Sequence, residues 1–322
     1  MDQTKNGYIS VPDTDMKDDL KGKLDEDVTV KQDKDKIGSG GHGSVFPGIL
    51  EWASERITTC AIKYCDWDSD KATTQRREIA TLQTLNRHRN IVDFYGFELV
   101  SKPDGSISGY RIFMDRMETD LHKLYKTSKF KSSEHKSEII EHVAFSAANG
   151  LADIFKNHKI VHRDVKPSNI LLDCSGNVKL TDFGVSRDIE KSEAATYVGT
   201  HGYLAPEMRQ SAANQKYSYK VDIWALGITL FEVVIGRHPC PNGIQGREAA
   251  PSLNVNHEID GESFKILYRI VSFVNRCLIK DVINRATYDV LRTSDMYKEA
   301  SKAEQRTKDS LGHLVKAPNL HE

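Results

Sequence analysis

The segment His162-Arg163-Asp164-Val165-Lys166-Pro167-Ser168-Asn169 constrains this chain more than any other feature. Five of its residue types stand at fixed spacing, a combination expected by chance in roughly one of ten thousand sequences of this length. Phosphoryl transfer needs a carboxylate that orients the attacking hydroxyl and accepts its proton, and Asp164 can supply it. Lys166 brings positive charge to the transferred phosphate, and Asn169 offers a neutral oxygen to Mg²⁺. A polar turn after a helix would explain the polarity but not the spacing.

A second acidic signal follows at Asp182-Phe183-Gly184, thirteen residues beyond Asn169. Asp182 is expected to be the second oxygen ligand of Mg²⁺, bridging the cation to the β- and γ-phosphates. The motif Ala205-Pro206-Glu207 then closes the segment that Asp182 opens. Arg285 is a candidate for the buried partner of Glu207.

Asp222 begins an apolar stretch that is expected to be a buried helix, Asp222 to Ile235. This aspartate is a candidate to tie that helix back to the segment around Asp164.

The pattern Gly38-x-Gly40-x-x-Gly43 fits two phosphate-binding designs, because glycines let the backbone amides approach a phosphate. Its spacing is a weak signal, expected by chance in roughly one such sequence in ten, and an ordinary turn would also fit. A dinucleotide fold needs a helix directly after the loop. Val45 to Leu50 is instead rich in strand-forming residues. The context therefore favours a loop between two antiparallel strands.

Lys63 closes the next β-rich run, some twenty residues past the glycine loop. A lysine at the end of a strand is usually only solvated, but a cation at this place can reach the α- and β-phosphates. The following segment offers Glu78, whose carboxylate is expected to hold the ammonium in an ion pair. Glu55 is an acidic alternative, but it precedes the lysine rather than following it.

Hydrophobic periodicity divides the chain into a small part rich in sheet and a larger helical part. Strands are expected at 44–50, 57–64, 91–100 and 110–114, with short strands at 170–173 and 178–181, and helices at 73–85, 137–156, 222–235 and 264–278. This is an α+β plan whose join falls near Met114 to Glu118. The polar residues 1–30 are expected to be a flexible tail, and the chain is expected to fray again after about Lys298.

Composition excludes several functions for the 322-residue chain. A net charge of −1 gives no reason to expect nucleic acid or an anionic membrane as a partner. Met1 to Ser10 have no apolar core of the kind that a signal peptide needs, so none is expected. The most apolar stretch is too short and too charged to span a bilayer. Cytoplasm, with the nucleus as a second compartment, is the expected location. The five cysteines have no metal or redox spacing and are expected to be reduced: Cys60, Cys65, Cys174, Cys240 and Cys277.

With these motifs in hand, the chain resembles eukaryotic protein kinases over about Val30 to Met296. The resemblance implies a bilobal α+β fold, with a small β-rich N-lobe holding one main helix at about 31–114 and a larger α-helical C-lobe at about 118–297. A flexible tail at 1–30 and a polar tail at 298–322 would flank the kinase domain of 31–297. Lys166-Pro167-Ser168 is similar to the serine/threonine branch.

The same resemblance implies ATP and Mg²⁺ as cofactors and assigns roles to single residues. Catalysis would fall to Asp164, Lys166, Lys63 and Glu78, and metal binding to Asn169 and Asp182. The nucleotide would be bound by Ile37, Gly38, Ser39, Gly40, Gly41, His42, Gly43, Ser44, Val45 and Lys63, by the gatekeeper Met114, and by Asp115 and Met117 of the adenine-binding hinge.

Within the kinases the chain resembles the MAP kinase kinases, which phosphorylate threonine and tyrosine in the activation loop of a MAP kinase. Ser192-Glu193-Ala194-Ala195-Thr196 matches the paired activation sites of that group, and Asp120 to Lys126 is similar to its stress-activated branch. The resemblance implies two protein partners, a MAP kinase substrate and an upstream kinase that phosphorylates Ser192 and Thr196. Arg163, with Arg187 and Lys191 nearby, is expected to pair with those phosphates.

Two departures from the family pattern bear on substrate docking. Residues 241–263 read as loop where the family usually has a docking helix, and Ala286 stands where the family prefers proline. Lys21 and Lys23 precede Val28-Thr29-Val30 in a faint resemblance to a MAP kinase docking site, which plain disorder would also explain. Two alternatives stay open: a serine/threonine kinase outside the MAP kinase cascade, and a pseudokinase scaffold, which the retained catalytic residues argue against.

Overall fold

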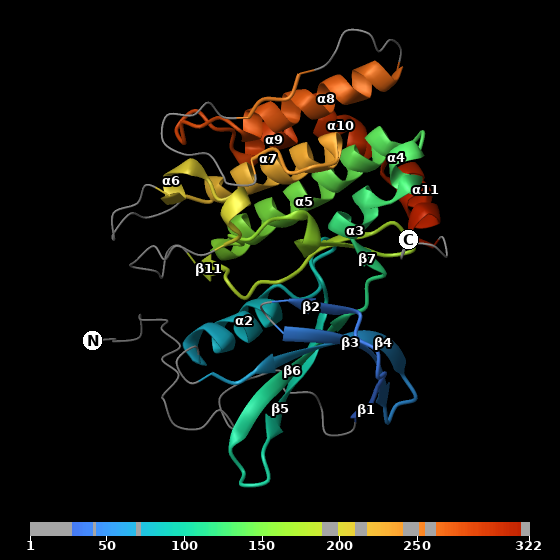
Figure 1. Cartoon of the computed structure of the whole chain (residues 1–322), viewed down its shortest axis with the longest axis vertical. Helices are drawn as coiled ribbons and strands as arrows, with labels where there is room; N and C mark the ends of the chain where they lie inside the picture. Colours follow the sequence, from blue (N-terminus) through green and yellow to red (C-terminus); the bar gives the residue numbers. More distant parts are fainter. Residues whose placement is uncertain are drawn as a thin grey trace, which may run out of the picture. The chain divides into compact units, whose positions relative to one another are not determined.

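The computed structural model of the chain (Figure 1) describes residues 28–40, 43–68, 72–188, 199–209, 218–240, 251–254 and 262–316. These residues form two compact units. Unit 1 consists of 28–68 and 95–113, and unit 2 of 72–94 and 114–316.

Unit 1 is built on a sheet in the order β1-β3-β4-β6-β5, with β2 paired to β3. Its strands are β1 Val28–Gln32, β2 Gly38–Gly40, β3 Gly43–Trp52, β4 Ile57–Asp66, β5 Phe94–Ser101 and β6 Ile107–Asp115. Side chains alternate between the two faces of a strand, and Leu50, Cys60, Ile62 and Phe113 form a fully buried cluster in the core of this unit. All four strands predicted for this part of the chain are confirmed, with shifted ends.

Unit 2 is mostly helical. Its helices are α2 Ala72–Thr84, α3 Leu121–Lys126, α4 Ser128–Ser132, α5 Lys136–His158, α6 Pro206–Arg209, α7 Lys220–Ile235, α8 Glu262–Cys277, α9 Tyr288–Arg292, α10 Asp295–Lys302 and α11 Glu304–Lys316. Small strands pair β10 Val178–Leu180 with β9 Ile170–Leu172, β9 with β7 Thr119–Asp120, and β11 Arg187–Asp188 with β8 Ile160–Val161. The four long helices that the periodicity predicts are confirmed as α2, α5, α7 and α8.

Helix α7 forms the centre of unit 2, packed between α5 and α8. It is buried from Val221 to Val233, on every side, which is typical of a helix enclosed in a large core. It ends where Gly236 adopts a left-handed conformation (φ 75°) and donates its N–H to Glu232 O (2.8 Å). The buried helix expected from the apolar stretch is thus confirmed.

The prediction of a frayed C-terminus after Lys298 is wrong. Helix α10 runs to Lys302, and α11 continues to Lys316 and packs on α5. Thr307, Leu311, Gly312 and Val315 are buried at helical spacing along one face. They are too few among charged residues to raise the hydropathy of the segment, so composition suggested a tail. At the other end β1 begins at Val28, inside the expected tail of 1–30, and 1–27 lie outside the described residues.

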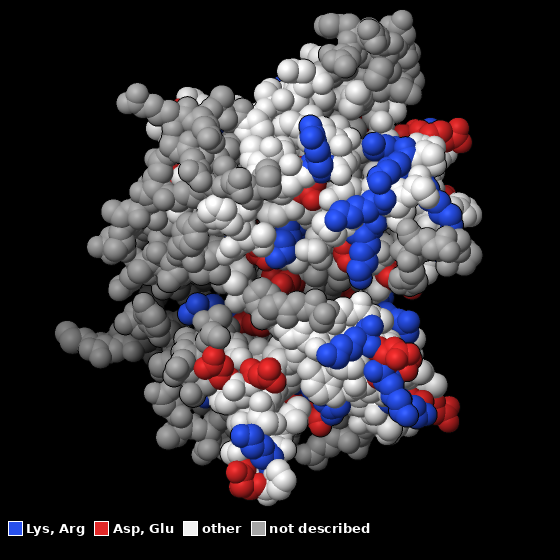
Figure 2. All heavy atoms as spheres, in the orientation of Figure 1, with Lys and Arg blue, Asp and Glu red and all other residues white. Residues whose placement is uncertain are grey.

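The near-zero net charge of the chain conceals a local basic surface. Figure 2 shows lysine and arginine side chains gathered over α3 and α4, to which these helices contribute Lys123, Lys126, Lys129 and Lys131. No helix in the described ranges has both the length and the apolar character needed to cross a bilayer.

Replacing Gly312 by alanine tests how tightly α11 is docked. An added Cβ would lie 2.6 Å from Cys174 O, and overpacking of this kind costs about 1–3 kcal/mol. Alanine favours an exposed helix over glycine by about 1 kcal/mol, so the two effects oppose each other, and we expect the steric cost to win. Urea unfolding should show Gly312→Ala less stable than the wild type, while the exposed neighbour His313→Ala stays within error. Greater stability of Gly312→Ala would mean that α11 is not held against this turn.

Candidate active site

The Asp164 carboxylate lies at the centre of a closed set of polar contacts in unit 2. Its Oδ1 accepts from the N–H (3.0 Å) and the hydroxyl (2.8 Å) of Thr200. Its Oδ2 accepts from Lys166 Nζ (2.7 Å) and Asn169 Nδ2 (3.0 Å). Lys166 Nζ also donates to Thr200 Oγ1 (2.8 Å). The structure therefore brings together three residues that the sequence singles out, Asp164, Lys166 and Asn169, and adds Thr200.

The surroundings of Asp164 keep it ionised. Burial alone would raise its pKa, but the hydrogen bond and charge of Lys166, followed by the hydroxyl of Thr200, outweigh burial and lower the pKa below its ordinary value. The carboxylate is thus an acceptor at neutral pH, as a base that orients a hydroxyl must be.

The backbone before Asp164 is fixed by Asp222, near the start of α7. The two oxygens of this carboxylate accept the N–H groups of His162 and Arg163, both at 2.7 Å. Arg163 adopts a left-handed conformation (φ 67°), which is costly for a non-glycine residue. Burial raises the pKa of Asp222, against the effect of His162 and of the two N–H groups. The predicted tie between the central helix and this segment is confirmed.

A hairpin brings the two expected magnesium ligands together. Asn169 directly precedes β9 and Asp182 follows β10 by two residues, and these strands pair antiparallel with Ile170 opposite Leu180. Beyond that pair Thr181 N donates to Asn169 O (3.1 Å). The two chain ends that carry the ligands are therefore neighbours.

The donor atoms of this pair fit Mg²⁺. Asn169 Nδ2 donates to both Asp164 O (2.8 Å) and Asp164 Oδ2 (3.0 Å), so its Oδ1 is the atom that can coordinate a cation. Asp182 adds a carboxylate, on a backbone in the left-handed conformation (φ 64°). Magnesium is commonly bound by one or two such oxygens together with phosphate and water.

The two residues after Asp182 pack against His162 and lie near α2. Phe183 is buried against the ring of His162 (centroids 4.7 Å apart), and His162 Nε2 donates to Thr181 O (2.9 Å). A Cβ on Gly184 would lie 3.3 Å from Glu78 Oε2. The buried Glu78 carboxylate of α2 therefore lies beside the motif that begins at Asp182.

In unit 1 the described glycines of the pattern lie where β2 and β3 pair. Gly38 pairs with Val45 and Gly40 with Gly43, and β3 begins at Gly43, so a strand follows the last glycine where a dinucleotide fold requires a helix. Gly43 has φ 121°, and a Cβ there would lie 1.9 Å from Tyr64 O, so a side chain cannot be accommodated. Gly41 and His42 lie outside the described residues.

Lys63 lies on the next strand, directly opposite Val45 in the β3–β4 register. Residues that face each other in an antiparallel pair project from the same side of the sheet. The lysine is 8% exposed, which excludes the solvated strand end that a lone lysine would suggest. Lys63 and Glu78 belong to different units, so their ion pair stays a prediction.

The expected gatekeeper Met114 is buried, and Asp115, the first residue of the expected hinge, donates its N–H to Asp93 O (3.0 Å). Met117 is half-buried. Their contact with adenine stays a prediction.

The expected partner of Glu207 is also confirmed. Arg285, 1% exposed, donates from Nη1 and Nη2 to the two carboxylate oxygens at 2.6 and 2.9 Å. Its Nε donates to Ile279 O (2.9 Å) and its Nη1 also to Lys220 O (2.9 Å). The contact anchors the end of the segment that Asp182 opens.

Other expected positions are less complete. Ser192, Thr196 and Lys191 lie outside the described residues, as do 241–250 and 255–261 of the expected docking loop. Thr200 was given no role, because a single hydroxyl carries no signal of its own.

Protein kinases combine three features that are present here. The first is a carboxylate flanked by a lysine and an asparagine, and the second is an asparagine–aspartate pair suited to Mg²⁺. The third is a glycine-rich pair of strands beside a buried lysine. The sequence model of the family described as "Protein kinase domain" matches residues 31–297. The chain belongs to this family and is of the MAP kinase kinase type.

Three relatives carry the narrower assignment. MAP kinase kinase mkk-4 of Caenorhabditis elegans is 33% identical over 277 residues, 83% of this chain and 73% of that protein. The dual specificity mitogen-activated protein kinase kinase jkk-1 of the same organism is 33% identical over 266 residues, 79% of this chain and 59% of jkk-1. The mitogen-activated protein kinase kinase MST7 of Pyricularia oryzae is 29% identical over 288 residues, 86% of this chain and 66% of MST7.

The contacts of Asp164 predict how acid inactivates the enzyme. Removing the Lys166 ammonium or the Thr200 hydroxyl removes a cause that lowers the pKa of Asp164, so the base should take up its proton at higher pH. The acidic limb of the kcat/KM profile should therefore move upward in the order wild type, Thr200→Val, Lys166→Met. Thr200→Ser keeps the hydroxyl and should keep the wild-type limb. Coincident limbs in all four proteins would show that these contacts do not set the protonation of the base.

Proposed function

We propose that this chain is a dual-specificity MAP kinase kinase. It transfers the γ-phosphoryl group of ATP to the threonine and the tyrosine in the activation loop of a MAP kinase, and it is activated when an upstream kinase phosphorylates Ser192 and Thr196. The observation that carries the proposal is the Asp164 carboxylate, held between Lys166 and Thr200 in a chain of MAP kinase kinase type.

In the proposed reaction Asp164 orients the substrate hydroxyl and accepts its proton. Lys166 neutralises charge on the transferred phosphoryl group while it holds the base. Thr200 already places a hydroxyl 2.8 Å from Asp164 Oδ1, so this oxygen has the geometry that a substrate hydroxyl requires. Mg²⁺, held by Asn169 Oδ1 and Asp182, would neutralise the phosphate oxygens when bound.

The residues proposed to bind the nucleotide are those that the resemblance to protein kinases implies. The hairpin from Ile37 to Val45 would cover the phosphates with its backbone amides, and Lys63 would pair with the α- and β-phosphates. Glu78 would hold that lysine. The hinge at Asp115 and Met117 would bind the adenine beside the gatekeeper Met114.

Activation is proposed to act through charge on the segment between Asp182 and Glu207. Each phosphate would add a charge of about −1.5 to −2. Arg163 is the proposed cation, because its Nε donates to Val185 O (2.7 Å), which places the guanidinium against the start of that segment. An ion pair between Arg163 and these phosphates would hold the segment that contains Thr200 against Asp164.

The location proposed for this relay is the cytoplasm or the nucleus. The proposal rests on the five cysteines, whose scattered positions have no metal or redox spacing, a pattern typical of reduced thiols.

A panel of catalytically dead MAP kinases tests the substrate. The wild type should place phosphate on both threonine and tyrosine of one panel member, and Asp164→Asn should lower this rate about 10²- to 10⁴-fold. Phosphorylation of generic serine/threonine substrates alone would favour a kinase outside the cascade. ATP binding without transfer would favour a pseudokinase. Phosphate transfer by the wild type that Lys63→Met abolishes would exclude one.

The activation sites are tested with the double variant Ser192→Ala/Thr196→Ala. Because it offers no hydroxyl to the upstream kinase, its activity toward the MAP kinase should not rise when that kinase is added. Ser301→Ala, at an exposed position of α10, is the matched control and should be stimulated like the wild type. Full stimulation of the double variant would refute the two sites.

A further inference from the structure

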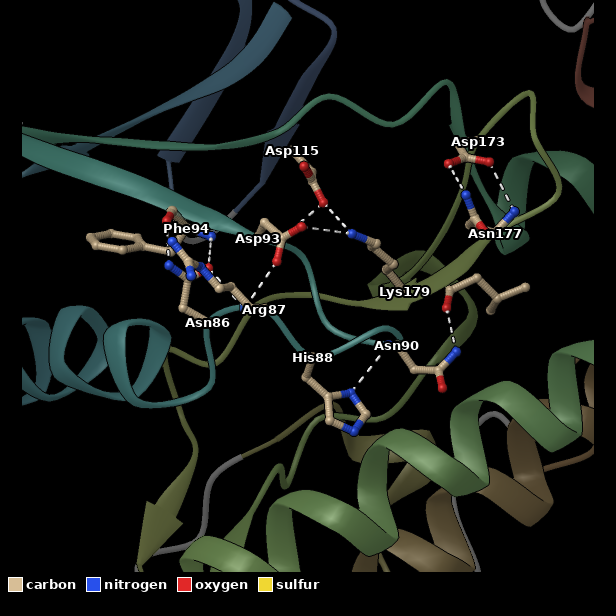
Figure 3. A network of polar contacts seen from close by, with 11 residues as sticks. Asn86, Arg87, His88, Asn90, Asp93, Phe94, Asp115, Asp173, Asn177 and Lys179 are labelled. Atoms are coloured by element: carbon tan, nitrogen blue, oxygen red, sulfur yellow. Dashed lines mark hydrogen bonds and ion pairs between the residues drawn. The ribbon is translucent and has the colours of Figure 1, made fainter. Parts of the chain in front are cut away.

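Lys179, in the middle of β10, lies between two carboxylates that the catalytic machinery does not use directly (Figure 3). Its Nζ donates to Asp115 Oδ2 (2.5 Å) and to Asp93 Oδ2 (3.2 Å). The side chain of Lys179 is 13% exposed and that of Asp115 15%. An ordinary solvated lysine on a short strand would have neither two acidic partners nor this burial.

The two carboxylates also belong to one backbone arrangement. Asp115 N donates to Asp93 O, and Asp115 Oδ2 accepts from Asp93 N, both at 3.0 Å. Asp115 Oδ2 is therefore shared between an ammonium and an amide. The ammonium balances two negative charges that the backbone pairing forces close together.

The contacts reach the loop that follows α2. Asp93 Oδ1 accepts from Arg87 N (3.0 Å), and Asn86 Oδ1 accepts from the N–H groups of Arg87 and Phe94, both at 3.0 Å. Asn86 Nδ2 donates to Phe94 O (2.9 Å). Figure 3 shows Asp93 in contact with Arg87 on one side and with Lys179 on the other, and Asn86 beside Phe94. The loop is thus held in one conformation from the end of α2 to the start of β5.

The same loop is bonded to the strand that carries Lys179. Asn90 Nδ2 donates to Val178 O (3.0 Å), Leu180 N to Asn90 O (2.8 Å), and Val92 N to Leu180 O (3.0 Å). Strand β10 leads in two further residues to Asp182. Lys179 therefore stands where the chain toward the metal ligand, the loop after α2 and the hinge at Asp115 meet.

Electrostatics agree with a permanently charged lysine. Burial by itself would lower the pKa of Lys179, but the hydrogen bonds and charges of Asp115 and Asp93 outweigh it and raise the pKa above its ordinary value. Without the ammonium, two carboxylates would face each other in a partly buried place, an arrangement that repels.

We propose that Lys179 is a positioning residue for the nucleotide: by holding Asp115 against Asp93 it fixes the adenine-binding hinge relative to the strand that delivers Asp182. The inference rests on the proposed function, because the hinge role of Asp115 belongs to it. Lys179 itself touches no reacting atom, so its effect is on binding rather than on the chemical step.

The test is a KM-against-kcat comparison of Lys179→Met with the wild type. We expect KM for ATP to rise about tenfold while kcat at saturating ATP changes less than about twofold, the pattern of lost uniform binding. Lys179→Arg keeps the charge between the carboxylates and should stay within about threefold of the wild-type KM. Lys302→Met, which removes an exposed ion pair with Glu299, is the matched control and should leave both constants unchanged.

A double variant tests whether repulsion between the two carboxylates causes the rise in KM. Lys179→Met/Asp115→Asn removes that repulsion, so its KM should fall back toward the wild-type value, as expected for residues in direct contact. If Lys179→Met does not fold, Asp93→Asn and Asp115→Asn carry the test, and wild-type KM in both would overturn the proposal.

Three other results would overturn it: an unchanged KM in folded Lys179→Met, a fall in kcat alone, or a rise in activity. Direct titration of each protein with a fluorescent ADP analogue distinguishes this failure from that of the proposed function. Absence of phosphoryl transfer by the wild type would refute the function. Equal nucleotide affinity of the wild type and Lys179→Met would refute the positioning role.

Discussion

The buried carboxylate of Asp222 is the contact on which the catalytic segment depends. A left-handed Arg163 (φ 67°) persists only where its surroundings over-determine it, since such a conformation costs about 1–3 kcal/mol. Asp222 supplies that constraint with two charge-assisted hydrogen bonds of 2.7 Å to consecutive N–H groups. Because the next residue is Asp164, the direction of the base is set by a helix in the middle of the core. A functional group built on such support is held more precisely than one that a loop must position alone.

Charged side chains hold two other irregular segments of unit 2. Arg285 binds Glu207 in a bidentate pair, and Lys179 binds Asp93 and Asp115. Each ion pair joins a segment without regular structure to a helix or strand. Loops cannot bury enough apolar surface to fix themselves, and their backbone groups need partners. Removal of one member of a buried pair is strongly destabilising, so these ties make a few side chains indispensable to segments that carry the chemistry.

Sequence reasoning singled out residues whose types and spacing are unusual, and missed residues that act through their place in the fold. Asp164 and Asn169 were singled out by type and spacing, and the structure brings their side chains together. Lys179 and Thr200 were missed, because a lysine in a three-residue strand and a threonine in a loop are common everywhere. Their partners are 64 and 36 residues away in the sequence, and only the folded chain brings them together.

Helix α11 was missed for a related reason. Its buried side chains occupy one narrow face, so composition, which averages over all faces, suggested a tail. The long helices α5 and α7 were predicted because α5 carries a broad apolar stripe at helical spacing and α7 is apolar on every side. The predicted ion pair of Lys63 with Glu78 joins residues of separate units. This prediction therefore rests on the chemistry of phosphate binding alone.

Two aspartates near the site show how the fold separates support from reaction. Burial raises the pKa of Asp222, against the backbone N–H groups and the charges of His162 and Arg163. Asp164 is also buried, yet Lys166 and Thr200 lower its pKa. Asp222 is held by backbone N–H groups, whose position follows from the fold. Asp164 is held by the side chains of Lys166 and Thr200, which the proposed function places beside the transferred phosphate. On that proposal the contacts of the base can change with substrate, while those of the carboxylate that aims it are set by the backbone.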